Sequence, residues 1–314
     1  METRISQSRI AIEPRPIRQF AAENLRDLRA GRALLIDAGI AMQSGNRIEQ
    51  AIFVLEAATE TGQLLPIHRG DEHGLYALEV ALDYSAIARS LGGSLPVSDR
   101  RELRDSLAGE LAPPSNRRSA LQLQSQFVAM AAAKLGELHV SRPSMHGGGA
   151  GKSPDMIAEI GTMRYGIECK RPQRIENVLP RFQEGIVQLS EFDVNGGVLI
   201  DVSDCVRDHS PASIDDTVER VSQSLYNLIF TDGVGHKPGM ERIMTAGCFA
   251  RVAVPVPDGA NVGYVQLHTS SLFGVFARAK GTLTHHHARE LRTGFQDGFD
   301  RLYRTWTEEA RSEP

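Results

Sequence analysis

Hydrophobic residues recur at helical spacing through the first third of the chain. Apolar positions three or four residues apart predict helices around three sets of residues: Ile48, Ile52 and Leu55; Leu75, Leu78 and Leu82; and Leu103, Leu107 and Leu111. The pattern breaks at Ser44-Gly45-Asn46, at Gly92-Gly93-Ser94 and at Pro113-Pro114. Because two consecutive prolines cannot continue a helix, the last break predicts a helical module over 1–112 and a second domain over 113–314.

The second domain alternates between helical and extended patterns. It begins with a predicted helix, three short strands, a second helix and an apolar strand, at 116–138, 137–142, 155–160, 164–171, 174–191 and 197–202. A helix, two strands and a C-terminal helix follow at about 214–230, 247–256, 261–270 and 285–310. This mixture predicts an α/β fold with a mixed sheet, of the α+β kind, and an N-terminal helical region.

Composition narrows the class of protein further. Hydrophobic residues make up 41% of the 314 residues and charged residues 24%, which is typical of a folded globular chain. The formal net charge of −4 gives no overall basic field that would indicate nucleic acid. Cys169, Cys205 and Cys248 are widely spaced, which favours a reducing compartment. The start METRISQSRI has no apolar signal segment, and no run reaches the ~18 apolar residues of a membrane span. We therefore expect a cytoplasmic protein with no membrane association.

A glycine-rich run at 146–153, HGGGAGKS, resembles the end of a phosphate-binding loop. However, His146 stands where the first glycine of that motif belongs, and Pro154 follows where a helix should open. We therefore expect a loop here rather than an ATP-binding site, and an ATPase is the third choice of function. Lys152 in this loop is a candidate contact to a nucleic-acid phosphate.

The next two strands bring charged residues together. Gly161-Thr162 predicts a short turn, so 155–160 and 164–170 should form an antiparallel hairpin. Asp155, at the start of one strand, and Glu168, late in the next, then lie at the same end of the sheet. Since side chains on a strand alternate between faces, Glu168 and Lys170 share one face. Two carboxylates and an ammonium group should converge there.

This group of residues suits phosphodiester hydrolysis. Carboxylate oxygens such as those of Asp155 and Glu168 are the ligands that Mg²⁺ or Mn²⁺ prefers, and the backbone carbonyl of Cys169 could add another oxygen. A divalent cation lowers the pKa of water and binds phosphate oxygens. Lys170 can orient the attacking water or stabilise developing negative charge.

Ser153-Pro154-Asp155, twelve intervening residues and Glu168-Cys169-Lys170 together resemble the signature of the PD-(D/E)XK nuclease superfamily. The resemblance covers about 116–203 and implies the αβββαβ core of restriction-endonuclease-like proteins. It implies Asp155 and Glu168 as metal ligands and Lys170 as the catalytic lysine. Many members also carry an acidic residue on the first core helix, where this chain has glutamines. Glu159 or Gln124 would have to replace that ligand, and Gln188 on the second core helix is a further accessory candidate.

The resemblance leads us to expect a Mg²⁺-dependent endonuclease that acts on DNA rather than RNA. Lys152, Arg171 and Arg174 are the expected nucleic-acid contacts, since arginine and lysine bind phosphate backbones. In bacteria this fold commonly serves restriction or anti-phage defence, and the partners we expect from the resemblance are a second copy of the chain or an ATPase or helicase subunit. The alternative is a catalytically degenerate nuclease-fold protein that binds nucleic acid or a protein partner.

Overall fold

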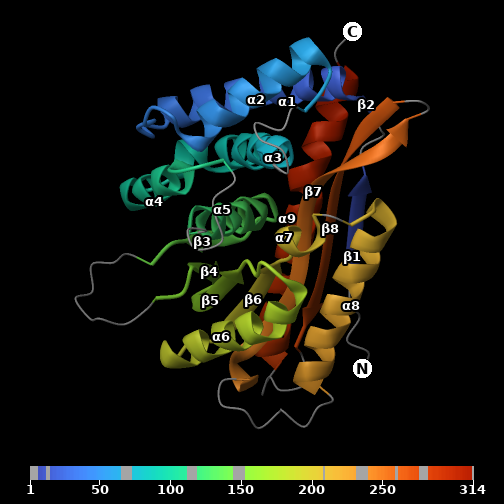
Figure 1. Cartoon of the computed structure of the whole chain (residues 1–314). Coiled ribbons are helices and arrows are strands. Elements are labelled where there is room, and N and C mark those ends of the chain that lie inside the picture. Colours follow the sequence, from blue (N-terminus) through green and yellow to red (C-terminus); the bar gives the residue numbers. More distant parts are fainter. Residues whose placement is uncertain are drawn as a thin grey trace. The chain divides into compact units, whose positions relative to one another are not determined.

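The computed structural model describes most of the chain, namely residues 6–11, 15–64, 73–111, 119–143, 153–207, 209–230, 240–258, 261–275 and 282–312 (Figure 1). Its contacts divide the chain into two compact units. Unit 1 comprises Met1–Ile10, Ala132–Ala250 and His268–Pro314, and unit 2 comprises Ala11–Ala131 and Arg251–Leu267. The expected domain boundary after residue 112 lies outside the described residues, and the division between the units falls inside helix α5.

Unit 2 is mainly helical. Its elements are β2 (Arg15–Pro16), α1 (Ile17–Asp37), α2 (Arg47–Thr61), α3 (His73–Leu91), η1 (Gly92–Ser94), α4 (Val97–Leu107) and most of α5 (Ser119–Leu135). Helices α1, α2 and α3 pack against one another. Short polar and glycine segments set the helix ends, as the sequence predicts. The Asn46 side chain accepts hydrogen bonds from the backbone N–H groups of Ile48 and Glu49, and α2 ends at Gly62 with φ of 74°.

Unit 1 is built on a mixed sheet. In the described residues its strand order is β1 (Ser6–Ala11), β8 (Asn261–Gly274), β7 (Ile243–Asp258), β6 (Gly196–Asp201), β5 (Met163–Lys170), β4 (Met156–Ile160) and β3 (His139–Ser141). Strands β3, β4 and β5 are antiparallel neighbours, whereas β5, β6 and β7 run parallel. β7 and β8 extend into unit 2, where β8 pairs with β2. The chain is therefore a mixed α/β protein.

The elements predicted for 113–314 are all present among the described residues, with shifted ends. The helices of unit 1 are α6 (Val178–Glu191), α7 (Ser203–Val206), α8 (Pro211–Phe230) and α9 (Thr282–Ser312), with short 3-10 turns η2 (Ile175–Asn177) and η4 (Met240–Arg242). Strand β1 was not predicted, because SQSRIA shows too little alternation in six residues to distinguish a strand from a helix. None of the described helices is both long and apolar enough to cross a membrane.

One face of the unit 1 sheet is covered by α6 and α8 (Figure 1). At Gly185 in α6, an added Cβ would lie 2.9 Å from Cγ1 of Val198 and 3.4 Å from Cβ of Glu168. On α8, the Ser222 hydroxyl lies 3.2 Å from the Cys248 sulfur of β7. Glu168 therefore projects into the layer between β5 and α6.

The opposite face of the sheet is covered by α9. Tyr165 of β5 hydrogen-bonds His287 of α9, and the rings of Phe249 and Phe299 lie 4.6 Å apart. Tyr165 and Glu168 are three positions apart on one strand, so they point to opposite faces, as alternation requires. The α6 face of β5 thus carries the charged residues and the α9 face carries packing residues.

Candidate active site

The hairpin of β4 and β5 brings the predicted acidic residues together. Its strands pair with Met156 opposite Ile167, and the turn at Gly161 has φ of 59°, which favours glycine. Asp155, one residue before β4, consequently lies beside the backbone of Glu168 and Cys169. The predicted hairpin is confirmed.

Three side chains form the candidate site, namely Asp155, Glu168 and Lys170, and we call them the acidic cluster. Asp155 Oδ2 accepts a hydrogen bond of 2.8 Å from the backbone N–H of Cys169. Lys170 Nζ donates to Glu168 Oε2 at 2.6 Å and lies 3.9 Å from Asp155 Oδ2. The Glu168 side chain is 1% exposed and that of Lys170 is 10% exposed. The lysine thus lies between two carboxylates in a nearly buried position.

The electrostatics of the acidic cluster are unbalanced, with two carboxylates and one ammonium group. Burial and the nearby Asp155 charge raise the pKa of Glu168 to about 7, although Lys170 opposes this. Burial also raises the pKa of Asp155, again against the attraction of Lys170. Burial alone would lower the pKa of Lys170, but the two carboxylates raise it above its usual range. Lys170 therefore stays a cation at neutral pH.

Glu168 keeps one oxygen without a partner. Its Oε1 atom is buried and makes no hydrogen bond to any described part of the chain. A buried carboxylate oxygen in this state is costly, unless a cation or a ligand donor satisfies it. Asp155, Glu168 and the Cys169 carbonyl supply the hard oxygens that Mg²⁺ or Mn²⁺ requires, so the residues fit a divalent cation.

The set of side-chain ligands is small. Within the residues the structure describes, no group of three or more His, Cys, Asp or Glu side chains is placed to hold a metal. Mg²⁺ commonly binds one or two carboxylates and takes its remaining oxygens from water and substrate phosphates. Two carboxylates are therefore enough for a site that becomes complete with substrate.

Two residues near the acidic cluster were not predicted. Arg142, just after β3, contributes to lowering the pKa of Asp155, and Glu184 of α6 contributes to raising the pKa of Lys170. Both come from segments whose position depends on packing rather than on local pattern. The neighbouring Gly185 was the available signal, since a glycine inside an amphipathic helix often marks a close approach.

The accessory ligands proposed from the sequence are placed differently. Glu159 lies four residues beyond Asp155, which is ~13 Å along an extended strand, and it forms an ion pair with Arg164 at 3.7 Å. Gln124 belongs to unit 2, where its amide accepts from Arg47 at 2.6 Å and donates to Asp83. Both placements correct the expectation of an added metal ligand, because Glu159 lies too far along the strand from Asp155 and the Gln124 amide is engaged in unit 2.

Gln188 on α6 keeps its place as an accessory candidate. It lies one turn beyond Gly185, the residue that packs against Glu168, and residues three apart share a helix face. Its Oε1 atom is buried and makes no hydrogen bond to the described residues. Besides Glu168 Oε1 on β5, the Gln188 amide oxygen is thus a second unsatisfied acceptor, and it lies on the helix that covers the acidic cluster.

The expected nucleic-acid contacts separate into three cases. Arg171 is buried and donates to Asp204 at 2.8 Å, which corrects the expectation that it binds substrate, since its guanidinium is engaged inside the protein. Arg174 is exposed and lies 3.8 Å from Glu176, so it remains available to a ligand. Lys152 lies outside the described residues, as does the glycine run before it.

The phosphate-loop alternative also loses its structural context. The segment after Ser153 forms strand β4 rather than a helix, so no helix N-terminus follows Lys152 and Ser153. A phosphate-binding loop requires that helix, because its backbone N–H groups face the phosphates. The described residues that follow Ser153 therefore do not have the structure of a phosphate-binding loop.

Comparisons with models of known protein families, with curated proteins and with solved structures find no match to this chain. Its function has to be inferred from the geometry and chemistry of the site.

Proposed function

We propose that this protein is a metal-dependent endonuclease that hydrolyses phosphodiester bonds in DNA with Mg²⁺ or Mn²⁺. The observation that carries the proposal is the acidic cluster, in which Lys170 binds Glu168 at 2.6 Å while Glu168 Oε1 remains without a partner. An excess of buried negative charge with an unsatisfied oxygen is the chemistry of a cation site.

The arrangement of strands and helices supports a restriction-endonuclease-like core. Helix α5 precedes three strands, and α6 and β6 follow them. The neighbouring pairs are antiparallel, antiparallel and parallel along β3, β4, β5 and β6. This is the αβββαβ order implied by the resemblance, with Asp155 and Glu168 at one end of the central hairpin.

Each residue of the acidic cluster has a separate role in the proposal. Asp155, Glu168 and the Cys169 carbonyl would hold the cation. When bound, the cation supplies positive charge to phosphate oxygens and lowers the pKa of water. Lys170 remains protonated at neutral pH, so it serves as a hydrogen-bond donor to water or phosphate and not as a base. The backbone N–H of Cys169 fixes the orientation of Asp155.

The test is a cleavage assay on supercoiled plasmid, linear duplex, single-stranded DNA and RNA, each with Mg²⁺, Mn²⁺ or a chelator. We expect metal-dependent cleavage of DNA by the wild type and by Arg164→Ala, whose exposed side chain lies at the other end of the hairpin. Asp155→Ala and Lys170→Ala should keep the fold and DNA binding but lose cleavage. Full cleavage by either of these two variants would refute the assignment.

A second candidate is a non-catalytic protein that uses a degenerate nuclease fold to bind a partner. It is favoured by one observation. Helix α5 has Gln124 where many members of the superfamily carry an acidic metal ligand, and this Gln124 bonds Arg47 and Asp83 in unit 2. Such a protein should bind DNA or protein without taking up Mn²⁺. Mn²⁺ uptake that depends on Asp155 and Glu168 would exclude it.

A further inference from the structure

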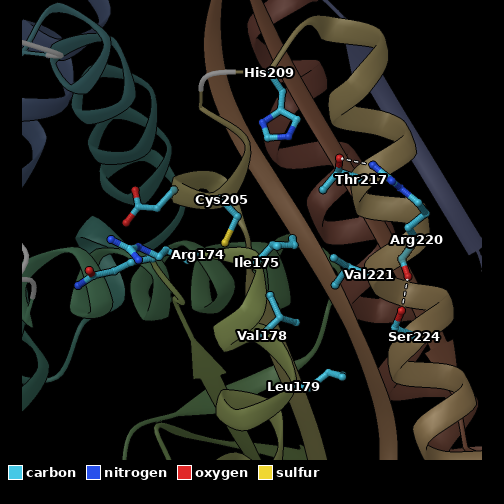
Figure 2. Close-up of a pocket in the computed structure, with 12 residues that line it drawn as sticks. Arg174, Ile175, Val178, Leu179, Cys205, His209, Thr217, Arg220, Val221 and Ser224 are labelled. Atoms are coloured by element: carbon cyan, nitrogen blue, oxygen red, sulfur yellow. Dashed lines mark hydrogen bonds between the residues drawn. The ribbon is translucent and has the colours of Figure 1, made fainter. Parts of the chain in front are cut away.

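A pocket of about 540 Å³ lies in unit 1 among α6, α7 and α8 (Figure 2). This volume falls in the range of small-molecule sites. Its apolar wall consists of Ile175 in η2, Val178 and Leu179 in the first turn of α6, and Val221 on α8. Ile175 is 46% exposed and Leu179 38% exposed, so the wall presents apolar surface to solvent. Such a wall suits the apolar part of a small molecule.

The acidic residue and the thiol that line the pocket do not oppose an anion. Asp204 accepts bonds from Arg171 and Arg207 at 2.8 and 2.9 Å, so its charge is compensated inside the protein. Burial and nearby carboxylates raise the pKa of Cys205 to about 12, so this thiol is uncharged at neutral pH. The remaining charged side chains of the lining are two arginines, and the pocket therefore favours a ligand with negative charge.

The two arginines lie on opposite sides of the pocket and differ in their surroundings (Figure 2). Arg174 is exposed and lies 3.8 Å from Glu176, so it already has an ionic partner. Arg220 on α8 bonds only neutral oxygens among the described residues, from Nε to the Asp216 carbonyl and from Nη2 to the Thr217 hydroxyl, both at 3.2 Å. An anionic group is therefore expected at Arg220 and not at Arg174.

The two hydrogen bonds also orient the Arg220 guanidinium. They use donors on the edge formed by Nε and Nη2, and they leave the end formed by Nη1 and Nη2 for a ligand. Two N–H groups side by side at such an end match the two oxygens of a carboxylate. Val221 of the apolar wall is the next residue on α8, so a ligand that contacts both residues needs an apolar body joined to an anionic group.

We propose that this pocket binds a small carboxylic acid, with its apolar body against the wall of α6 and α8 and its carboxylate at Arg220. A carboxylate carries a single negative charge, which one arginine balances, whereas a phosphate ester carries about −1.5 to −2 at neutral pH. Removal of the apolar body from water supplies binding energy, and the guanidinium fixes its orientation. The site does not include the acidic cluster, so it goes beyond the proposed function.

The first experiment is calorimetric titration of the metal-free protein with phenylpropionate and octanoate. Acetate is the probe without the apolar body, and phenylpropanol is the probe without the charge. We expect the two acids to bind more tightly than either control. No binding of either acid at millimolar concentrations, equal binding of phenylpropanol, or tighter binding of phenyl phosphate than of phenylpropionate would overturn the proposal.

The second experiment repeats the titration with variants of the anionic contact. Arg220→Gln should weaken binding of the acids about ten- to a hundred-fold, because it removes a charged hydrogen-bond donor. Arg174→Gln, on the opposite side of the pocket, is the matched control and should not change binding. Unchanged binding by Arg220→Gln, or an equal loss in Arg174→Gln, would overturn the assignment of the carboxylate.

A further pair of variants tests the apolar wall. Leu179→Asp should weaken binding at least about tenfold, since it places a charge where the apolar body packs. Val187→Asp is the control, because Val187 is also exposed on α6 but does not line the pocket. Equal binding by these two variants would contradict the role of the wall. All these titrations contain neither metal nor DNA, so their outcome is independent of whether nuclease activity is found.

Discussion

Lys170 and Arg171 are adjacent residues at the end of β5, yet their surroundings differ in charge balance. Lys170 lies between the carboxylates of Asp155 and Glu168. Arg171 bonds Asp204 at 2.8 Å and lies 3.7 Å from Asp201, and Arg207 adds a second cation at 2.9 Å from Asp204. We call this second group the paired cluster.

The pKa values of Glu168 and Asp204 reflect this difference in charge balance between the two clusters. In the acidic cluster, burial and repulsion raise the pKa of Glu168 to about 7. In the paired cluster, burial alone would raise the pKa of Asp204, but Arg171 and Arg207 bring it below its usual range. The paired cluster is complete without any ligand, so its role is structural. The acidic cluster has one more carboxylate than cation, and under the proposed function an added cation completes it. The two groups therefore predict opposite responses to mutation.

The largest expected effect concerns activity. Glu168→Gln should reduce DNA cleavage about 100- to 1,000-fold or more, because it removes charge that the cation requires. The same substitution should leave the free energy of unfolding of the metal-free protein unchanged or higher, since it removes repulsion from Asp155. Cleavage rates and urea unfolding measured on one preparation check both statements. A large loss of stability would mean that the acidic cluster is structural.

The next effect concerns stability. Arg171→Met should lower the free energy of unfolding by about 3–5 kcal/mol, because it leaves the buried Asp201 without its cation and Asp204 with Arg207 alone. Arg164→Met on β5 is the matched control, and as an exposed residue it should change stability by less than about 0.5 kcal/mol. Equal effects of the two substitutions in urea denaturation would contradict the assigned role of the paired cluster.

The response to pH should have opposite sign in the two groups. The pKa of Glu168 is raised on folding, so its contribution is present at acid pH and is lost as pH rises from about 4.5 to about 7. Wild type should therefore lose on the order of 1–3 kcal/mol relative to Glu168→Gln over that range, with chelator present. The pKa of Asp204 is lowered, so its contribution is lost as pH falls below about 4. Parallel stability curves for wild type and Glu168→Gln would contradict this.

The smallest expected effect tests the packing of α6 over the acidic cluster. Gly185→Ala places a methyl group 2.9 Å from Val198 and 3.4 Å from Glu168, so the Val198 side chain or α6 must shift. Overpacking and the better helix propensity of alanine oppose each other, which leaves a net loss of about 1 kcal/mol. Gly93→Ala, where an added Cβ meets nothing, is the control. Melting curves and cleavage rates of the two variants check this, and we expect reduced cleavage in Gly185→Ala alone.

The β4–β5 hairpin and the side chains at its end could be predicted from the sequence. Hydrophobic period identified the strands of the hairpin, and alternation placed Glu168 and Lys170 on one face. Those inferences need only neighbouring residues. They also explain why Asp155 was found, since its partner lies directly across a short turn.

The partners that Arg171 and Gln124 find far away in the sequence could not be predicted. Arg171 follows Lys170 in sequence and has the composition of a phosphate contact, but it pairs with Asp204, 33 positions away on α7. Gln124 is engaged by Arg47 and Asp83, which are 77 and 41 positions away. A sequence pattern gives the type of each side chain, whereas these partners depend on how helices dock. The same limit applies to Arg142 and Glu184.

The central claim is that the acidic cluster is a cation site. Titration of the metal-free protein with Mn²⁺, followed by calorimetry, tests it most directly, and Glu159→Gln is the control because that carboxylate lies at the far end of β4. We predict Mn²⁺ binding by wild type and Glu159→Gln, and its loss in Asp155→Asn and Glu168→Gln. No Mn²⁺ uptake by wild type, or undiminished uptake by Glu168→Gln, would contradict the claim.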